Sequence, residues 1–263
     1  MTHPTARTMK DILDLPLDDD QAALWFLGQA GYVIRAGDLS VAIDPYLTDS
    51  VGRVNPPFAR ALPVPLAPER LKVDVFIVTH DHLDHLDPDT IAAYAHKATT
   101  LFVAPRLAAR KLASLGIGAD RIRRVDAGET ADLDGLAVTG VYAVPTGPDV
   151  VDTTGYLLTF ANGRTVYHSS DTAASDLLAK AAPKTPEVML VCINGKYGNL
   201  SVEQAVRLTA AVRPRVAVPN HYDLMALNSE NPDTFVHFMH QAEPSVRVEV
   251  LEIMRPFVWS AGA

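Results

Sequence analysis

The sequence has a single cysteine, Cys192, among its 263 residues, so no disulfide can form within the chain. An isolated cysteine is typical of a reducing compartment, and we therefore expect a cytoplasmic protein. Long apolar runs are also lacking, because no stretch approaches the ~20 residues of a membrane span. Residues 1–21 form a polar leader without the apolar centre of a signal peptide.

An excess of positive charge is lacking as well. The chain has 23 lysines and arginines against 31 acidic residues, for a net charge of −8. Nucleic acids and anionic membranes need a basic face, so neither is an expected partner. A small-molecule substrate, even an anionic one, stays compatible if a metal ion holds it. Hydrophobic residues make up 48% of the chain, enough for the core of one domain over residues 1–263.

The N-terminal part contains short apolar runs separated by glycine turns. The runs at residues 23–27, 31–36 and 39–45 predict antiparallel strands. Residues 48–71 then hold five prolines and no periodic pattern, which predicts a surface loop serving as a lid or a subunit contact. The continuous apolar run at residues 73–78 predicts a strand that is buried on both faces.

Helices and strands alternate through the rest of the chain. Asp87 and Pro88 predict the first turn of a helix. The pair Asn162 and Gly163 predicts a hairpin, and residues 246–254 are rich in strand formers. Two β-rich stretches with interspersed helices predict an α/β fold with two sheets packed face to face and helices outside, a four-layer αββα sandwich.

A cluster of metal-binding side chains follows the buried strand, in the stretch "VTHDHLDHLDPDT". On an extended chain end alternate residues point the same way, so His80 and His82 can converge on one ion. Asp84 and His85 lie past the strand end and can turn towards a second ion. Imidazole and carboxylate groups bind divalent metals at hydrolytic sites. The alternative, polar residues that cap the next helix, explains this spacing of histidines less well.

This H-x-H-x-D-H run resembles the signature of the metallo-β-lactamase superfamily. The segments "FLGQAGYVIRAGDLSVAIDPYLTD", "YHSSDT", "INGKYGNLSVEQAV" and "VPNHYDLMALN" are similar to its ascorbate-6-phosphate lactonase-like branch. The resemblance covers most of the chain, from about Trp25 to Phe238. It implies a metallo-β-lactamase-like fold, a hydrolase with one or two divalent ions (manganese or zinc) per chain, and a homo-oligomer.

The resemblance also implies further ligands. Asp171 stands at the position of the family's metal-bridging aspartate, although Ser170 precedes it where a glycine is usual. It could at the same time cap a helix expected over residues 172–182. His221 stands at the position of the last ligand of the second metal, and Asp44 resembles an aspartate that orients a ligand. The implied metal ligands are His80, His82, Asp84, His85, Asp171 and His221.

One expected histidine is missing. Most superfamily members supply it between the cluster and the bridging aspartate, but this chain has no histidine between residues 97 and 167. Three interpretations stay open. Asp149 or Asp152 replaces it as an oxygen ligand, which favours manganese over zinc; water or substrate completes an open shell; or the first position is vacant and one ion lies among Asp84, His85, Asp171 and His221.

Three further residues are candidates for substrate contact. They are His168, just before the bridging aspartate, Asn194, after a buried strand, and Arg60, in the proline-rich loop. Each has a structural alternative. His168 could hydrogen-bond a carboxylate near the metal, Asn194 could make an Asn-Gly turn, and Arg60 could be a surface charge.

The leading hypothesis is a metal-dependent hydrolase in which an activated water attacks a lactone or other cyclic ester. Asp84 is its catalytic residue, because it would both bind metal and hold the proton of the nucleophile. Sugar-acid lactones, including phosphorylated ones, are the first class to test. One alternative is a phosphodiesterase on a small cyclic or lipid phosphodiester. Another, motivated by the missing histidine and Ser170, is a non-catalytic protein that binds a metal or ligand.

Overall fold

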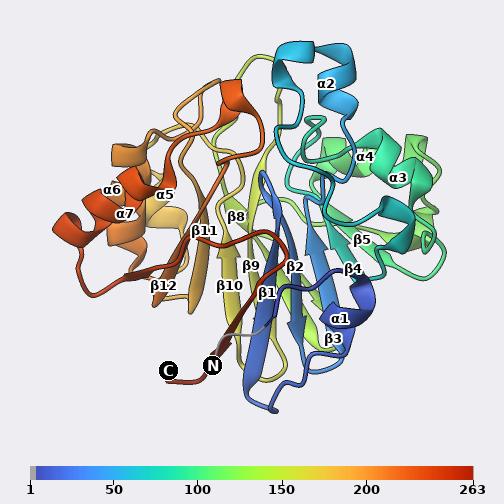
Figure 1. The fold of residues 1–263 in the computed structure, drawn as a ribbon, viewed down its shortest axis with the longest axis horizontal. Helices are drawn as coiled ribbons and strands as arrows, with labels where there is room; N and C mark the ends of the chain where they lie inside the picture. Colours follow the sequence, from blue (N-terminus) through green and yellow to red (C-terminus); the bar gives the residue numbers. More distant parts are fainter. Residues whose placement is uncertain (1–3, 263) are drawn as a thin grey trace.

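The computed structural model describes residues 4–262, in which the strands form two seven-stranded sheets. The helices α3 (Pro88–Ala93) and α4 (Arg106–Ser114) cover the outer side of one sheet. On the outer side of the other lie α5 (Leu178–Ala181), α6 (Val202–Val212) and α7 (Pro232–Ala242) (Figure 1). The predicted αββα sandwich is therefore confirmed. No helix in the described range is long and apolar enough to cross a membrane.

The first sheet has the order β14-β1-β2-β3-β4-β5-β6. The first three strands along the chain are antiparallel, as predicted, and β4, β5 and β6 follow in parallel. Their bounds are β1 Gln21–Gly28, β2 Gly31–Ala36, β3 Leu39–Ile43, β4 Val75–Ile77, β5 Leu101–Ala104, β6 Ile122–Arg124 and β14 Pro256–Ser260.

The second sheet has the order β13-β12-β11-β10-β9-β8-β7. Its strands β7 to β10 are antiparallel, and β10 to β13 are parallel. The hairpin predicted at Asn162 and Gly163 joins β9 to β10. The bounds are β7 Thr130–Leu133, β8 Leu136–Tyr142, β9 Thr154–Phe160, β10 Thr165–His168, β11 Val188–Cys192, β12 Val216–Asn220 and β13 Arg247–Val248.

Both faces of the central strands are covered. In β1, Leu24 and Phe26 belong to the core between the sheets, whereas Trp25 and Leu27 belong to the core beneath the outer helices. A strand covered on both faces can be apolar throughout, which explains the continuous apolar runs in the sequence. The polar residues that follow such strands are brought to one edge of the sandwich.

Two terminal segments differ from the prediction. The leader is not merely polar, because α1 (Met9–Leu13) begins with a capping box between Thr8 and Asp11 and buries Met9 and Ile12. Of residues 246–254, only β13 is a strand. That segment passes from the edge of one sheet to the edge of the other, so backbone pairing cannot continue along it. The strand that completes the first sheet is β14, which pairs with β1.

The helix predicted over residues 172–182 was wrong in its first half. The backbone of Thr172 accepts a hydrogen bond from Leu200, and Ala173 donates one to Val144. These bonds to neighbouring segments replace the bonds of a helical turn, so α5 begins only at Leu178. Asp171 is therefore not a helix cap.

The proline-rich loop, residues 48–71, contains α2 (Ser50–Val54) and two short 3-10 turns, Pro56–Phe58 and Pro68–Arg70. In Figure 1, α2 lies at the top of the molecule. In this loop the ring of Phe58 packs against that of Tyr197, with 5.5 Å between the ring centroids. It therefore adjoins the loop that follows β11.

Candidate metal centre

The polar residues at the carboxyl ends of several strands meet in the structure. Asp44 follows β3, the histidine cluster follows β4, Asp171 follows β10 and His221 follows β12. Apart from His82 and Asp84 they are deeply buried, since relative exposure is 0% for His80 and His221, 1% for His85 and 5% for Asp171. Buried polar groups must be paired or bind an ion to be stable.

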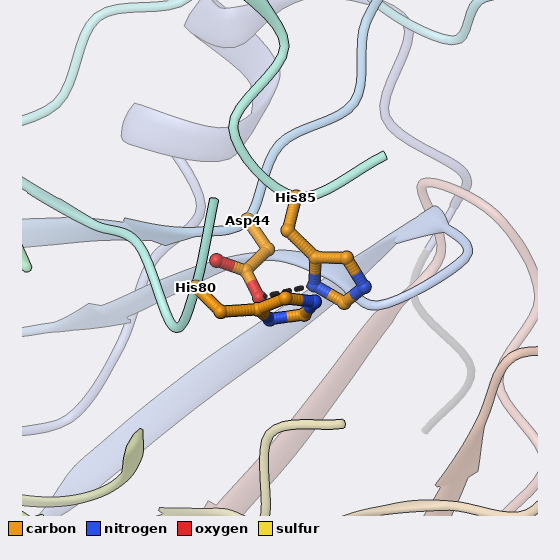
Figure 2. A group of neighbouring side chains, drawn as sticks. All are labelled: Asp44, His80 and His85. Carbon is orange, nitrogen blue, oxygen red and sulfur yellow. Dashed lines mark hydrogen bonds and ion pairs between the residues drawn. The ribbon is translucent and has the colours of Figure 1, made fainter. Parts of the chain in front are cut away.

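Asp44 holds the ring of His85. Its Oδ2 lies 2.7 Å from His85 Nδ1, and its carboxylate also accepts bonds from the backbone N (2.8 Å) and hydroxyl (2.5 Å) of Thr79. Figure 2 shows this contact, with the ring of His80 lying beside that of His85. This contact is the orienting one expected for Asp44, and it leaves His85 Nε2 free to face the centre.

Asp171 lies between two histidines. Its Oδ1 is 2.8 Å from His221 Nε2, and its Oδ2 is 3.5 Å from His85 Nε2. Asn199 Nδ2 donates a 2.7 Å bond to Oδ2, which fixes the carboxylate. Asp84 Oδ2 is 3.9 Å from His85 Nε2. Apart from the Asn199 amide, these contacts join imidazole nitrogens and carboxylate oxygens, which are atoms suited to bind a metal.

The charges of the centre are strongly coupled. Burial alone would raise the pKa of Asp171, but His221 and His85 outweigh it and hold that pKa well below its usual range. Burial would lower the pKa of His85, but Asp171, Asp84 and Asp44 raise it well above normal. For His80, burial and then His85 lower the pKa well below normal.

Polar atoms at the centre have few partners within residues 4–262. His221 Nε2 and Asp171 Oδ1 have only each other, at 2.8 Å, and His85 Nε2 makes no hydrogen bond, since Asp171 Oδ2 is 3.5 Å away. A buried, unpaired polar atom costs about 1–3 kcal/mol and is unusual in a native fold. Asp84, His85 and His221 each offer a ligand atom within 4.8 Å of the others. These residues fit a divalent ion bound by nitrogen and oxygen.

A second grouping of possible ligand atoms joins Asp44, His80 and His85 within the same 4.8 Å. This grouping suits a metal ion less well, because the carboxylate of Asp44 already contacts Thr79 and the Nδ1 of His85. The nitrogen of His80 that faces the centre has another neighbour. His80 Nε2 lies 3.1 Å from His82 Nδ1, close enough for both atoms to reach one ion at about 2.0–2.1 Å.

The structure separates the two aspartates considered for the missing histidine. Asp149 Oδ2 lies 3.2 Å from His82 Nε2, the nitrogen opposite the one that faces His80. Asp152 instead accepts a 3.0 Å bond from the backbone N of Leu107 at the start of α4. Asp149 therefore contacts the first position through the outer edge of the His82 ring, and Asp152 serves the helix.

Two of the predicted substrate contacts do not fit the geometry. His168 is 0% exposed, and its nitrogens lie 3.3 Å from Ala30 O and 2.9 Å from the backbone N of Ser170. Both ring nitrogens are thus used within the fold. Arg60 donates a 2.8 Å bond to Tyr46 O and lies over the Tyr46 ring, so its guanidinium binds its own loop.

Asn194 remains a candidate for substrate contact. It is 1% exposed, and its Nδ2 donates a 2.6 Å bond to Asn228 Oδ1. Its Oδ1 has no hydrogen-bond partner within the described residues. An amide oxygen left free in this way can accept a bond from a ligand.

Sequence reasoning missed Gln29 and Asn199, which contact the metal-facing carboxylates. The available signal is positional, because both lie in loops that follow strands of the sandwich. The backbone gives a second signal. Gln29, Asp44, Ser170 and His221 have φ of 58°, 42°, 60° and 63°. Left-handed residues other than glycine cost roughly 1–2 kcal/mol each and gather at functional sites.

Comparisons with known proteins agree with this chemistry. A family model described as a β-lactamase superfamily domain matches residues 40–222. A UPF0173 metal-dependent hydrolase from Thermoplasma acidophilum is 30% identical over 207 residues, covering 76% of this chain and 83% of that protein. Another, from Methanopyrus kandleri, is 28% identical over 236 residues, covering 86% and 95%.

Solved structures show the same fold. Igni18, a metallo hydrolase from Ignicoccus hospitalis, superposes with a TM-score of 0.72 at 23% identity, covering 91% of this chain and 99% of that one. An isothiocyanate hydrolase from Delia radicum gut bacteria gives 0.72 at 20% identity, with the same coverage.

Proposed function

Because the chain belongs to the metallo-β-lactamase superfamily and is a relative of its UPF0173 metal-dependent hydrolases, we propose that it hydrolyses a small-molecule lactone or other cyclic ester. The proposal includes membership of the ascorbate-6-phosphate lactonase-like branch. The observation that carries the proposal is the convergence of His85 Nε2, His221 Nε2 and the carboxylate of Asp171 in a buried centre, where His85 Nε2 makes no hydrogen bond within the described part of the chain.

Six residues take the metal-binding roles in this proposal. His80 and His82 would hold one divalent ion, Asp84, His85 and His221 would hold the second, and Asp171 would be shared between them. When bound, the ions lower the pKa of a water molecule and polarise the carbonyl that it attacks.

Asp84 is the catalytic residue in this proposal. Its side chain is 14% exposed, whereas those of His85 and Asp171 are 0% and 7% exposed. Among the residues proposed to hold the second ion, it is thus the most open to an entering substrate. Its Oδ2 is fixed by Gln29, so the carboxylate can hold the proton of the attacking water at one place.

In this proposal the first position binds its ion without a third histidine. We assign Asp149 to the outer nitrogen of His82, where it fixes the orientation of the ring. The coordination of the first ion then stays open for water or substrate, as catalytic metal sites require. Since Arg60 is bound to its own loop, a phosphate or carboxylate on the substrate would be held by the ions themselves.

The wider setting is proposed on the same basis. The chain would act as one domain over residues 1–263 in the cytoplasm, as a homo-oligomer, and on a small molecule. The proline-rich loop adjoins the loop after β11 through Phe58 and Tyr197, which suits either a lid or a subunit contact. Light scattering on wild type and on Phe58→Ala would measure the oligomer and separate these two roles.

Metal content and substrate preference test the function together. We would purify wild type, His80→Ala and His221→Ala with manganese and with zinc, and count bound ions per chain. About two ions in wild type, and a loss in each variant, are expected. Sugar-acid lactones would then be compared with cyclic phosphodiesters and an isothiocyanate. Metal binding with turnover of phosphodiesters alone would contradict the lactone assignment, and no metal binding would contradict the hydrolase.

A further inference from the structure

Gln29 lies in the turn between β1 and β2 and is fully buried. Its backbone has φ of 58°, a left-handed conformation that glutamine rarely adopts. A surface turn would place glycine or asparagine at such a position without strain. The side chain must therefore do something that a smaller residue cannot.

The amide nitrogen of Gln29 reaches two of the proposed metal ligands. Nε2 donates a 2.9 Å bond to Asp84 Oδ2 and lies 3.0 Å from His221 Nδ1. The backbone oxygen of Gln29 accepts a 2.8 Å bond from the backbone N of His221. Asp84 follows a strand of the first sheet and His221 follows a strand of the second. One residue thus links the two sheets at the centre.

We propose that Gln29 is a positioning residue for the second metal ion, setting Asp84 and His221 relative to each other. This inference rests on the proposed function, since it assumes that both residues bind that ion. Gln29 would not touch the reacting atoms itself. It would act by holding one carboxylate and one imidazole in the arrangement that the ion needs.

The chemistry of the His221 ring explains why the residue is a glutamine. In the structure Nδ1 faces an amide donor and Nε2 faces Asp171 Oδ1 at 2.8 Å, so Nε2 carries the ring proton. An ion on Nε2 requires the proton to be on Nδ1, which then needs an acceptor. The Oε1 of Gln29 is buried and has no partner within residues 4–262. A half-turn of the amide would supply it to His221 in exchange for the bond to Asp84, whose carboxylate would then be held by the ion, because an amide carries both a donor and an acceptor.

The test compares two variants that shorten a glutamine. Gln29→Asn suits the left-handed backbone but is one methylene too short to reach Asp84 and His221. Gln204→Asn is the control. Gln204 accepts a 2.9 Å bond from the backbone N of Ser201 at the start of α6, away from the centre. Both variants lose a local hydrogen bond, but only one should affect metal binding.

Affinities for Zn²⁺ and Mn²⁺ would be measured by chelator competition, with the melting temperature of the metal-free protein alongside. We expect Gln29→Asn to weaken the second ion about 10–100-fold and to leave the first unchanged. Gln204→Asn should lower the melting temperature without changing either affinity. If Gln29→Asn does not fold, Gln29→Met has the same length without polar atoms and is expected to lose the same affinity.

The outcomes separate this inference from the proposed function. If wild type binds two ions and both Gln29 variants bind the second as tightly as wild type does, the positioning role is wrong and the function stands. If the melting temperature of the Gln29 variants falls and their affinities do not, Gln29 is only structural. If wild type binds no metal, the proposed function fails and this inference fails with it.

Discussion

The two proposed metal positions are built differently. Around the second, His85, Asp171 and His221 are buried and come from both sheets, and Asp44, Gln29 and Asn199 hold them. Around the first, His80 is buried, but the side chain of His82 is 30% exposed and that of Asp149 is 74% exposed. One position is fixed by the core and the other depends on a surface loop.

The difference indicates where affinity and where turnover come from. A buried set of ligands held by hydrogen bonds is already arranged for its ion, so little ordering is needed on binding. An exposed set keeps a coordination position open to the solvent, where a substrate can enter. We therefore expect the second ion to bind more tightly and the first to exchange faster.

Replacing Asp171 should have the largest effect, because in the proposed site it is shared by the two ions. Asp171→Asn keeps the shape of the side chain but removes its charge from between His85 and His221. We expect the second ion to bind more than about 100-fold more weakly and hydrolysis to be lost. Isothermal titration with Zn²⁺ measures the binding. Asp176→Asn is the matched control, since Asp176 is exposed on the same segment. Tight binding of two ions in Asp171→Asn would contradict the shared role.

The second-largest expected difference between the two ions is the number of protons that their ligands release on metal binding. A metal binds only neutral imidazole, so a protonated ligand must lose its proton on binding. The pKa of His85 is raised well above normal by three carboxylates, so at neutral pH this ring is protonated. The pKa of His80 is lowered by burial and by His85, so that ring is already neutral.

The second ion should accordingly displace about one proton at pH 7 and bind more weakly as the pH falls. The first should displace none from His80. Titration calorimetry in buffers with different ionisation enthalpies counts these protons. Equal release by both ions would show that the charges of the two positions do not differ in this way.

Asp149 should have a moderate effect, limited to the first position. Asp149→Ala removes the contact to His82 Nε2, and we expect the first ion to bind about 10-fold more weakly with the second unchanged. Asp152→Ala is the control. It removes the bond to Leu107 N, so it should lower the free energy of unfolding by about 0.5–2 kcal/mol and leave metal binding unchanged. If Asp152→Ala instead weakens the first ion, the assignment of the two aspartates must be exchanged.

Much of the fold could be predicted, because it depends on local pattern. Apolar runs predicted the strands, and the Asp87–Pro88 and Asn162–Gly163 pairs predicted a helix start and a hairpin that the structure contains. The failures occur where tertiary contacts override propensity. Residues 172–177 have helical composition, yet the backbone bonds of Thr172 with Leu200 and of Ala173 with Val144 keep their first residues out of a helix.

The candidate site shows the same division. The histidine cluster could be recognised from the spacing of its residues, since they are close in sequence. The supporting residues could not be found in that way, because Gln29 contacts His221 across 192 positions. Nor could the sequence separate Asp149 from Asp152, which lie in one short segment but face His82 and α4 respectively.

Ser170→Gly should have the smallest effect and tests whether the two positions are mechanically linked. Ser170 Oγ lies 2.7 Å from Thr153 Oγ1, which joins the turn that carries Asp171 to the segment that carries Asp149. Glycine would remove the strain of φ 60°, roughly 1 kcal/mol, and would lose one hydrogen bond of about the same value. The free energy of unfolding in urea should therefore change by less than about 1 kcal/mol.

The same variant compares the two ions. The affinity for the second ion, which is held by buried residues, should be unaffected, whereas the affinity for the first should fall slightly as the segment loosens. Equal weakening of both ions would mean that the positions respond as one unit, and the contrast between them would not hold.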